Sequence, residues 1–110
     1  ISLGHQLMLG LPGQDFASLR QTLDRILVLA PDFVRIYPVL VLRDAPLAEW
    51  LRRGRYRPLT LERAVAQAAW LCERLERAGI RVVRLGLQPG PELENDLVAG
   101  PHHPAFGELV

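Results

Sequence analysis

A glycine-rich turn near the start of the chain is the first segment whose residues could bind a ligand. Gly10-Leu11-Pro12-Gly13 follows an apolar run and precedes Asp15, a residue type that often begins a helix. Backbone amides at a junction between a strand and a helix can bind an anionic or polar group. The turn has no lysine after its second glycine, so it is not a Walker sequence. A tight turn that needs glycine only for its backbone angles is the alternative interpretation.

Four arginines within six positions form a second candidate site. They are Arg52, Arg53, Arg55 and Arg57. Trp50, Gly54 and Tyr56 lie among them. Guanidinium groups bind phosphate and aromatic rings stack on bases, so this combination suits a nucleic acid. A solvated helix end is the alternative, because a net charge of +1 for the whole chain gives no general attraction for a polyanion.

The residue types that bind metals are few and widely spaced. His102 and His103 are adjacent between prolines, and neighbouring side chains of an extended segment point in opposite directions. His5 is isolated, and Cys72, the single cysteine, lies on the apolar side of an expected helix. No Ser/His/Asp order or paired carboxylates stand out. We therefore predict neither a metal site nor a catalytic residue within this chain.

The elements that must position these residues alternate between strand and helix. The expected strands are residues 3–11, 33–42 and 80–87, and the expected helices are residues 15–30, 46–54 and 61–78. Asp15, Asp44 and Thr60 are the predicted helix caps. Pro38 lacks the amide hydrogen that a sheet requires, so we expect a bulge or the end of the strand there. From residue 88 onward, prolines and glycines predict an irregular tail.

This order of elements predicts an α/β fold with three parallel strands in sequential order and the helices on one face of the sheet (βαβαβ). Such an arrangement is an arc of a β/α barrel, and therefore a partial barrel fragment with an irregular C-terminal tail. Barrels bind their ligands at the carboxyl ends of the strands. The glycine turn and residues 37–42 are both expected at that edge.

Composition excludes several classes of protein. Apolar residues make up 49% and charged residues 23%, which excludes a disordered chain. The longest apolar stretch, residues 26–42, is interrupted by Pro31, Asp32 and Arg35, so it falls short of the roughly 20 apolar residues of a membrane span. No signal sequence is recognisable, and we expect a cytoplasmic protein with no membrane partner. The chain begins at Ile1 without a methionine, and we interpret it as a piece of a longer protein.

One segment resembles a known family closely. Tyr37-Pro38-Val39-Leu40-Val41-Leu42-Arg43, followed by Gly54-Arg55-Tyr56, resembles the segment after the radical-SAM barrel strands in the catalytic subunit of Elongator and its prokaryotic relatives. A Tyr-Pro-x-Leu-Val-x-Arg run precedes a helix and a Gly-Arg-Tyr there. Leu9-Gly10-Leu11-Pro12-Gly13-Gln14 is similar to the strand-five turn of oxygen-independent coproporphyrinogen III oxidase and its radical-SAM relatives. Residues 98–110 resemble a bacterial Elongator-like branch, so the resemblance covers nearly the whole chain.

The resemblance implies a parent protein that binds S-adenosylmethionine and a [4Fe–4S] cluster held by three cysteines. With one cysteine, this chain is expected to lack the cluster loop and to bind no cofactor alone. Residues 1–58 would be the last strands and helices of the radical-SAM partial barrel. Residues 59–110 would be its C-terminal extension, packed with the rest as one unit. The predicted contacts to the adenosine side of the cofactor are Gly10, Leu11, Pro12, Tyr37, Pro38 and Leu40.

The chain departs from the superfamily at two positions of the first strand. The superfamily pattern is Gly-x-Ile-x-Gly-x-x-Glu, in which Met8 and Gly10 fit, whereas Gln6 and Gly13 replace Gly and Glu. The histidine of Elongator itself would align with Gln6, one position from His5. Acetyl-transfer chemistry is therefore not carried over by the resemblance.

The combined interpretation is a C-terminal fragment of an Elongator-like radical-SAM enzyme that modifies RNA. Arg52, Arg53 and Arg57 are expected to contact transfer RNA and Tyr56 to stack on a base, while Arg55 is assigned a structural role. The expected partners are the remainder of the parent barrel, transfer RNA, and a second copy of the chain through the exposed edge of the first strand. Two alternatives stay open: a coproporphyrinogen-oxidase-like radical-SAM oxidoreductase acting on a small molecule, and a non-catalytic binding or structural module.

Overall fold

The computed structural model describes residues 2–86, 96–103 and 105–110. Its elements in chain order are β1 (Gly4–Leu9), α1 (Phe16–Leu29), β2 (Phe33–Pro38), β3 (Val41–Leu42), α2 (Pro46–Arg52), α3 (Leu61–Arg77), β4 (Arg81–Leu85), β5 (Leu97–Ala99) and α5 (Phe106–Leu109). The strand order β1-β2-β4 in the main sheet confirms the predicted sequential order.

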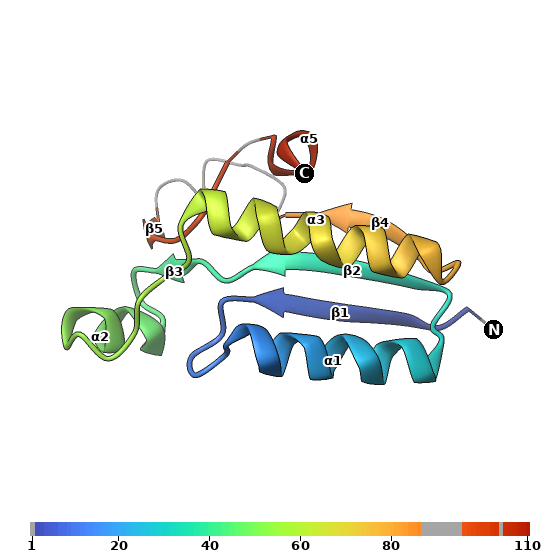
Figure 1. Ribbon diagram of the computed structural model, residues 1–110. Coiled ribbons are helices and arrows are strands. Elements are labelled where there is room, and N and C mark those ends of the chain that lie inside the picture. Colours follow the sequence, from blue (N-terminus) through green and yellow to red (C-terminus); the bar gives the residue numbers. More distant parts are fainter. Residues whose placement is uncertain (1, 87–95, 104) are drawn as a thin grey trace.

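The main sheet is parallel, as predicted, and its strands end at a common edge (Figure 1). Leu7 lies opposite Ile36, and Ile36 lies opposite Leu85. The register between β2 and β4 shifts once, between Val34 and Arg35. Because side chains alternate along a strand, Leu7 and Ile36 face one side of the sheet while their chain neighbours face the other.

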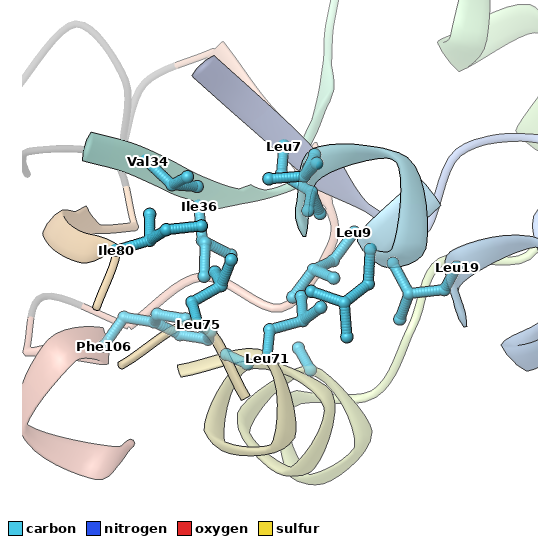
Figure 2. Packing of buried hydrophobic residues seen from close by; sticks show 13 residues of the cluster. Leu7, Leu9, Leu19, Val34, Ile36, Leu71, Leu75, Ile80 and Phe106 are labelled. Atoms are coloured by element: carbon cyan, nitrogen blue, oxygen red, sulfur yellow. The ribbon is translucent and has the colours of Figure 1, made fainter. Parts of the chain in front are cut away.

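Both long helices pack on that one side. The apolar positions of α1 and α3 recur at helical spacing, so each helix presents a single apolar stripe. Figure 2 shows Leu19 of α1 and Leu71 and Leu75 of α3 in one cluster with Leu7 and Ile36 of the sheet. This packing confirms the predicted arrangement of helices on one face, which is the arrangement of a barrel arc.

Two of the three predicted helix caps are confirmed. Asp15 Oδ1 accepts a hydrogen bond from Ser18 N at 2.8 Å, and Thr60 Oγ1 accepts one from Arg63 N at 3.2 Å. The prediction for Asp44 was wrong, because α2 begins after Ala45 with Pro46 in its first turn and no side chain caps it. Proline at the first helical position needs no hydrogen-bond acceptor, so the helix can start there without a capping side chain.

The second predicted strand is divided. β2 ends at Pro38, and β3 pairs antiparallel with β5 in a separate two-stranded sheet. The tail is therefore less irregular than expected. It ends in α5, whose Phe106 is buried so close to Gly86 that a Cβ on this glycine would lie 2.9 Å from Phe106 Cβ. Residue 87 of the third predicted strand and residues 88–95 of the predicted tail lie outside the described residues.

None of the helices in the described ranges combines the length and the apolar character that crossing a membrane requires.

Candidate functional site

The carboxyl edge of the main sheet brings together the two segments that were predicted to contact a cofactor. Leu9 and Pro38, the last residues of β1 and β2, lie opposite each other. Val39 N donates a hydrogen bond to Leu9 O at 2.7 Å, which continues the pairing past the end of β2. The turn after β1 and the segment after β2 are therefore side by side (Figure 1). Their contact with a cofactor stays a prediction.

Hydrogen bonds from one nearby and one distant side chain fix the turn at Gly10. Gly10 N donates to Gln14 Oε1 at 2.8 Å, and Gln14 Nε2 donates to Met8 O at 3.1 Å. Tyr56 OH donates to Gly10 O at 2.6 Å. Gly10 has a φ of +87°, and a Cβ there would lie 3.1 Å from Leu59 Cγ. Glycine is thus required at this position, and its polar atoms are already bonded within the chain.

Tyr56, which was predicted to stack on a base, is buried within the chain. Its side chain is 7% exposed, and burial raises the pKa of the phenol above its ordinary value. A neutral, buried hydroxyl is the form that can donate to the carbonyl of Gly10. The Gly-Arg-Tyr sequence therefore connects the segment after α2 to the first turn of the sheet. Sequence analysis missed this link because 46 positions separate its two residues.

An apolar hollow adjoins the glycine turn. It has a volume of about 410 Å³ and is lined by Pro12, Leu40, Ala45, Pro46, Leu47 and Trp50. Pro12 and Leu40 are predicted cofactor contacts, whereas the residues from α2 were not assigned to that wall. The indole of Trp50 is 46% exposed, so a flat group could pack against it.

The remaining predicted contacts do not share one surface. Tyr37 pairs with Met8 on the side of the sheet opposite the helices, whereas Pro38 is buried on the helix side. Arg35 shares the side of Tyr37, and its guanidinium carbon lies 5.1 Å from the ring centroid of Phe33. The motif selected Tyr37 without indicating which side of the sheet it faces, because strand alternation identifies a face only after the register is known.

The predicted nucleic-acid triad is divided into two environments. Arg52 and Arg53 both form ion pairs with Glu49 on the exposed surface of α2, at 2.9 Å for Arg53 Nε and Glu49 Oε1. Arg57 instead lines a hollow together with Arg63, a residue that sequence analysis did not select. Among the described residues, Arg52 and Arg53 are thus paired with Glu49, whereas Arg57 and Arg63 share a hollow without an ion pair.

Local surroundings account for the thiol of Cys72 and the imidazole of His103 in the described part of the chain. Burial, and to a smaller extent the charge of Glu76, raises the pKa of Cys72 to about 11, so this thiol is protonated at neutral pH. His103 Nδ1 accepts a hydrogen bond from Ala105 N at 3.0 Å. Within residues 2–86, 96–103 and 105–110, no three His, Cys, Asp or Glu side chains are grouped as metal ligands.

Comparisons with known proteins agree on one family. Residues 31–110 match the Radical_SAM C-terminal domain. A tRNA uridine(34) acetyltransferase from Methanocaldococcus jannaschii is 34% identical to this chain over 68 residues, which cover 59% of this chain. The chain spans only 13% of the length of that relative. The family match includes Leu40 and the arginines around α2 but begins after the glycine turn.

Proposed function

This chain belongs to the Radical_SAM C-terminal domain family, and we propose that it is the C-terminal part of an Elongator-like radical-SAM enzyme that modifies transfer RNA. The similarity to a tRNA-modifying protein is the observation that carries the proposal. The charge distribution supports it. Residues 43–63 contain six arginines and three acidic residues, a local charge of +3 in a chain whose net charge is +1. The rest of the chain is therefore acidic, and a polyanion would be directed toward this segment.

In such an enzyme, S-adenosylmethionine and a [4Fe–4S] cluster supply radical chemistry. The residues of this chain do not fit the cluster, because it needs several thiolates and Cys72 is a single, protonated thiol. The cluster ligands would therefore belong to another part of the parent protein.

We propose that the carboxyl edge forms the adenosine side of the S-adenosylmethionine site. Gly10 N and O are bonded to Gln14 and Tyr56, so this glycine shapes the wall and offers no free polar atom. The exposed side chain of Leu11, with Pro12 and Leu40, would provide apolar contacts. The volume of the adjoining hollow is in the range of small-molecule sites. Tyr37 would face the interior of the completed barrel, while Pro38 would support the wall from the helix side.

Arg52, Arg53 and Arg57 would contact phosphates of the transfer RNA. The pairs of Arg52 and Arg53 with Glu49 do not oppose this role, because surface ion pairs contribute about 0.2–1 kcal/mol and exchange partners readily.

The partner of the edge strand β1, the domain boundary and the location of the parent are also part of the proposal. The remainder of the parent barrel would pair with β1, an edge strand of the main sheet, and in the isolated chain a second copy would take that place. The boundary between the barrel part and the C-terminal extension would lie near residue 58. The parent would act in the cytoplasm, where transfer RNA is modified.

The experiment that tests the proposed function uses the parent protein after iron–sulfur reconstitution. We expect cleavage of S-adenosylmethionine to 5′-deoxyadenosine, and we expect transfer RNA to increase its rate. The 110-residue chain, treated in the same way, is the control and should bind no cluster. Cleavage that responds to a tetrapyrrole and not to transfer RNA would favour the coproporphyrinogen-oxidase-like alternative. No cleavage under any condition would contradict the proposal.

A further inference from the structure

A second hollow lies where α3 begins. Its volume is about 430 Å³, and it is lined by Gln14, Arg57, Pro58, Leu59, Thr60 and Arg63. It is more enclosed than the apolar hollow beside Trp50, and two of its six lining residues are arginines while none is acidic. The chain therefore concentrates positive charge around a concave surface at the carboxyl edge of the sheet.

The other polar side chains of this hollow are already bonded. The amide of Gln14 bonds Gly10 N and Met8 O, and Thr60 Oγ1 accepts from Arg63 N. The guanidinium groups of Arg57 and Arg63 form no ion pair within the described ranges, in contrast to the pairing of Arg52 and Arg53 with Glu49. The hollow thus offers two sets of charged donors without an acceptor between them.

We propose that this hollow binds a phosphate group, with the guanidinium groups of Arg57 and Arg63 donating to its oxygens. A guanidinium presents several N–H donors in a planar fork, which matches the oxygens of phosphate. The source of the phosphate rests on the proposed function: if the parent binds transfer RNA, the phosphate belongs to the RNA backbone. A phosphorylated small molecule offers the same group.

The test is a titration of the 110-residue chain with inorganic phosphate, followed by the NMR resonances of the arginine Nε–Hε groups. We expect Arg57 and Arg63 to shift together, and Arg57→Gln with Arg63→Gln to weaken binding by about tenfold or more, because bonds to charged groups are the stronger ones. Arg25→Gln with Arg81→Gln is the matched control, since it removes the same charge from exposed positions at the opposite edge. Backbone amide spectra verify the fold of each variant.

Two outcomes would overturn the inference. In the first, adding phosphate shifts neither the Arg57 nor the Arg63 resonance. In the second, the hollow variant, Arg57→Gln with Arg63→Gln, binds phosphate as tightly as the control variant does. Parallel titrations with single-stranded RNA and with ribose 5-phosphate identify the source. An RNA source predicts tighter binding of the RNA, with a salt slope that falls by about 0.7 for each phosphate that the variant no longer neutralises. Equal binding of the two ligands indicates a phosphorylated small molecule. If the parent binds transfer RNA and the hollow variant does not weaken it, this inference fails while the proposed function stands.

Discussion

The carboxyl edge of the main sheet, where its parallel strands end, and the amino edge, where they begin, are built in different ways. At the carboxyl edge, Gly10 is bonded to Gln14 and to Tyr56, so its position is fixed by side chains from two parts of the chain. At the amino edge, Val28 and Leu29 at the end of α1 are 85% and 67% exposed. One edge is held by specific polar bonds, and the other presents apolar side chains to water.

The carboxyl edge is therefore the expected site of ligand binding, and the amino edge is the expected site of assembly. Barrel enzymes bind ligands at the carboxyl ends of their strands, and the opposite end contributes to stability. A surface that orients a ligand needs fixed backbone atoms, which the bonds from Tyr56 and Gln14 provide. Exposed apolar side chains such as Val28 and Leu29 suit contact with protein. Several substitutions test the contrast.

The largest loss of stability is expected for Gly10→Ala. The new side chain would adopt a φ of +87° and meet Leu59 Cγ at 3.1 Å, and we expect a loss of about 2–3 kcal/mol in the free energy of unfolding. Gly13→Ala is the control, because Gly13 has a φ of +76° with no atom within 4 Å of a Cβ. Its expected loss is about 1 kcal/mol. Urea unfolding measures both, and equal losses would show that the contact with Leu59 contributes nothing.

A smaller loss is expected for Tyr56→Phe. Removing the hydroxyl leaves the carbonyl of Gly10 without its 2.6 Å hydrogen bond, at a cost of about 1–2 kcal/mol. Tyr37→Phe is the matched control, since Tyr37 is half-buried and, within the described residues, its hydroxyl has no such bond to a turn. The bond would be unimportant for stability if the two variants unfolded at the same urea concentration.

The same tyrosine predicts a dependence of stability on pH. Burial raises the pKa of Tyr56 in the folded chain, so its contribution is fully present below the unfolded pKa of about 10 and is lost as the pH rises through the folded pKa. The difference in stability between the wild type and Tyr56→Phe should therefore be constant up to about pH 10 and decrease above it. Taking this difference cancels the titration of Cys72, which is common to both proteins. A difference that grows with alkaline pH would contradict the burial of the phenol.

The smallest effect on stability is expected at the amino edge. Val28→Gln with Leu29→Gln should change the free energy of unfolding by no more than about 0.5 kcal/mol for each substitution, because both side chains are exposed. The same variant should weaken self-association of the isolated chain in sedimentation experiments. A wild-type chain that stays monomeric at high concentration would count against association at this edge and at strand β1.

Much of the fold could be predicted because its signals are local. Apolar spacing identified the two long helices, and the side chains of Asp15 and Thr60 bond to the backbone three residues later. The short pairing of β3 with β5 could not be predicted, because two- and three-residue strands carry almost no periodic signal.

The candidate site was predicted only in part, because some of its contacts join segments that are far apart in the sequence. Gly10 and Leu40 were found through a turn and a motif that are continuous in sequence. The bond from Tyr56 to Gly10 depends on how distant segments pack, and so does the approach of Arg57 to Arg63 around one hollow. The pairing of Arg52 and Arg53 with Glu49, in contrast, follows from helical spacing and could have been anticipated.

Binding of transfer RNA at the carboxyl edge is tested by measuring the affinity of the parent protein for transfer RNA at several salt concentrations. We predict that replacing Arg52, Arg53 and Arg57 by alanine weakens binding and flattens the dependence of log affinity on log salt by about 0.7–0.9 for each phosphate that is no longer neutralised. Alanine at Arg20, Arg25 and Arg81, three exposed arginines outside the arginine-rich segment, removes the same charge and should leave the slope unchanged. Wild-type affinity and slope in the first variant would contradict the claim that this edge binds RNA.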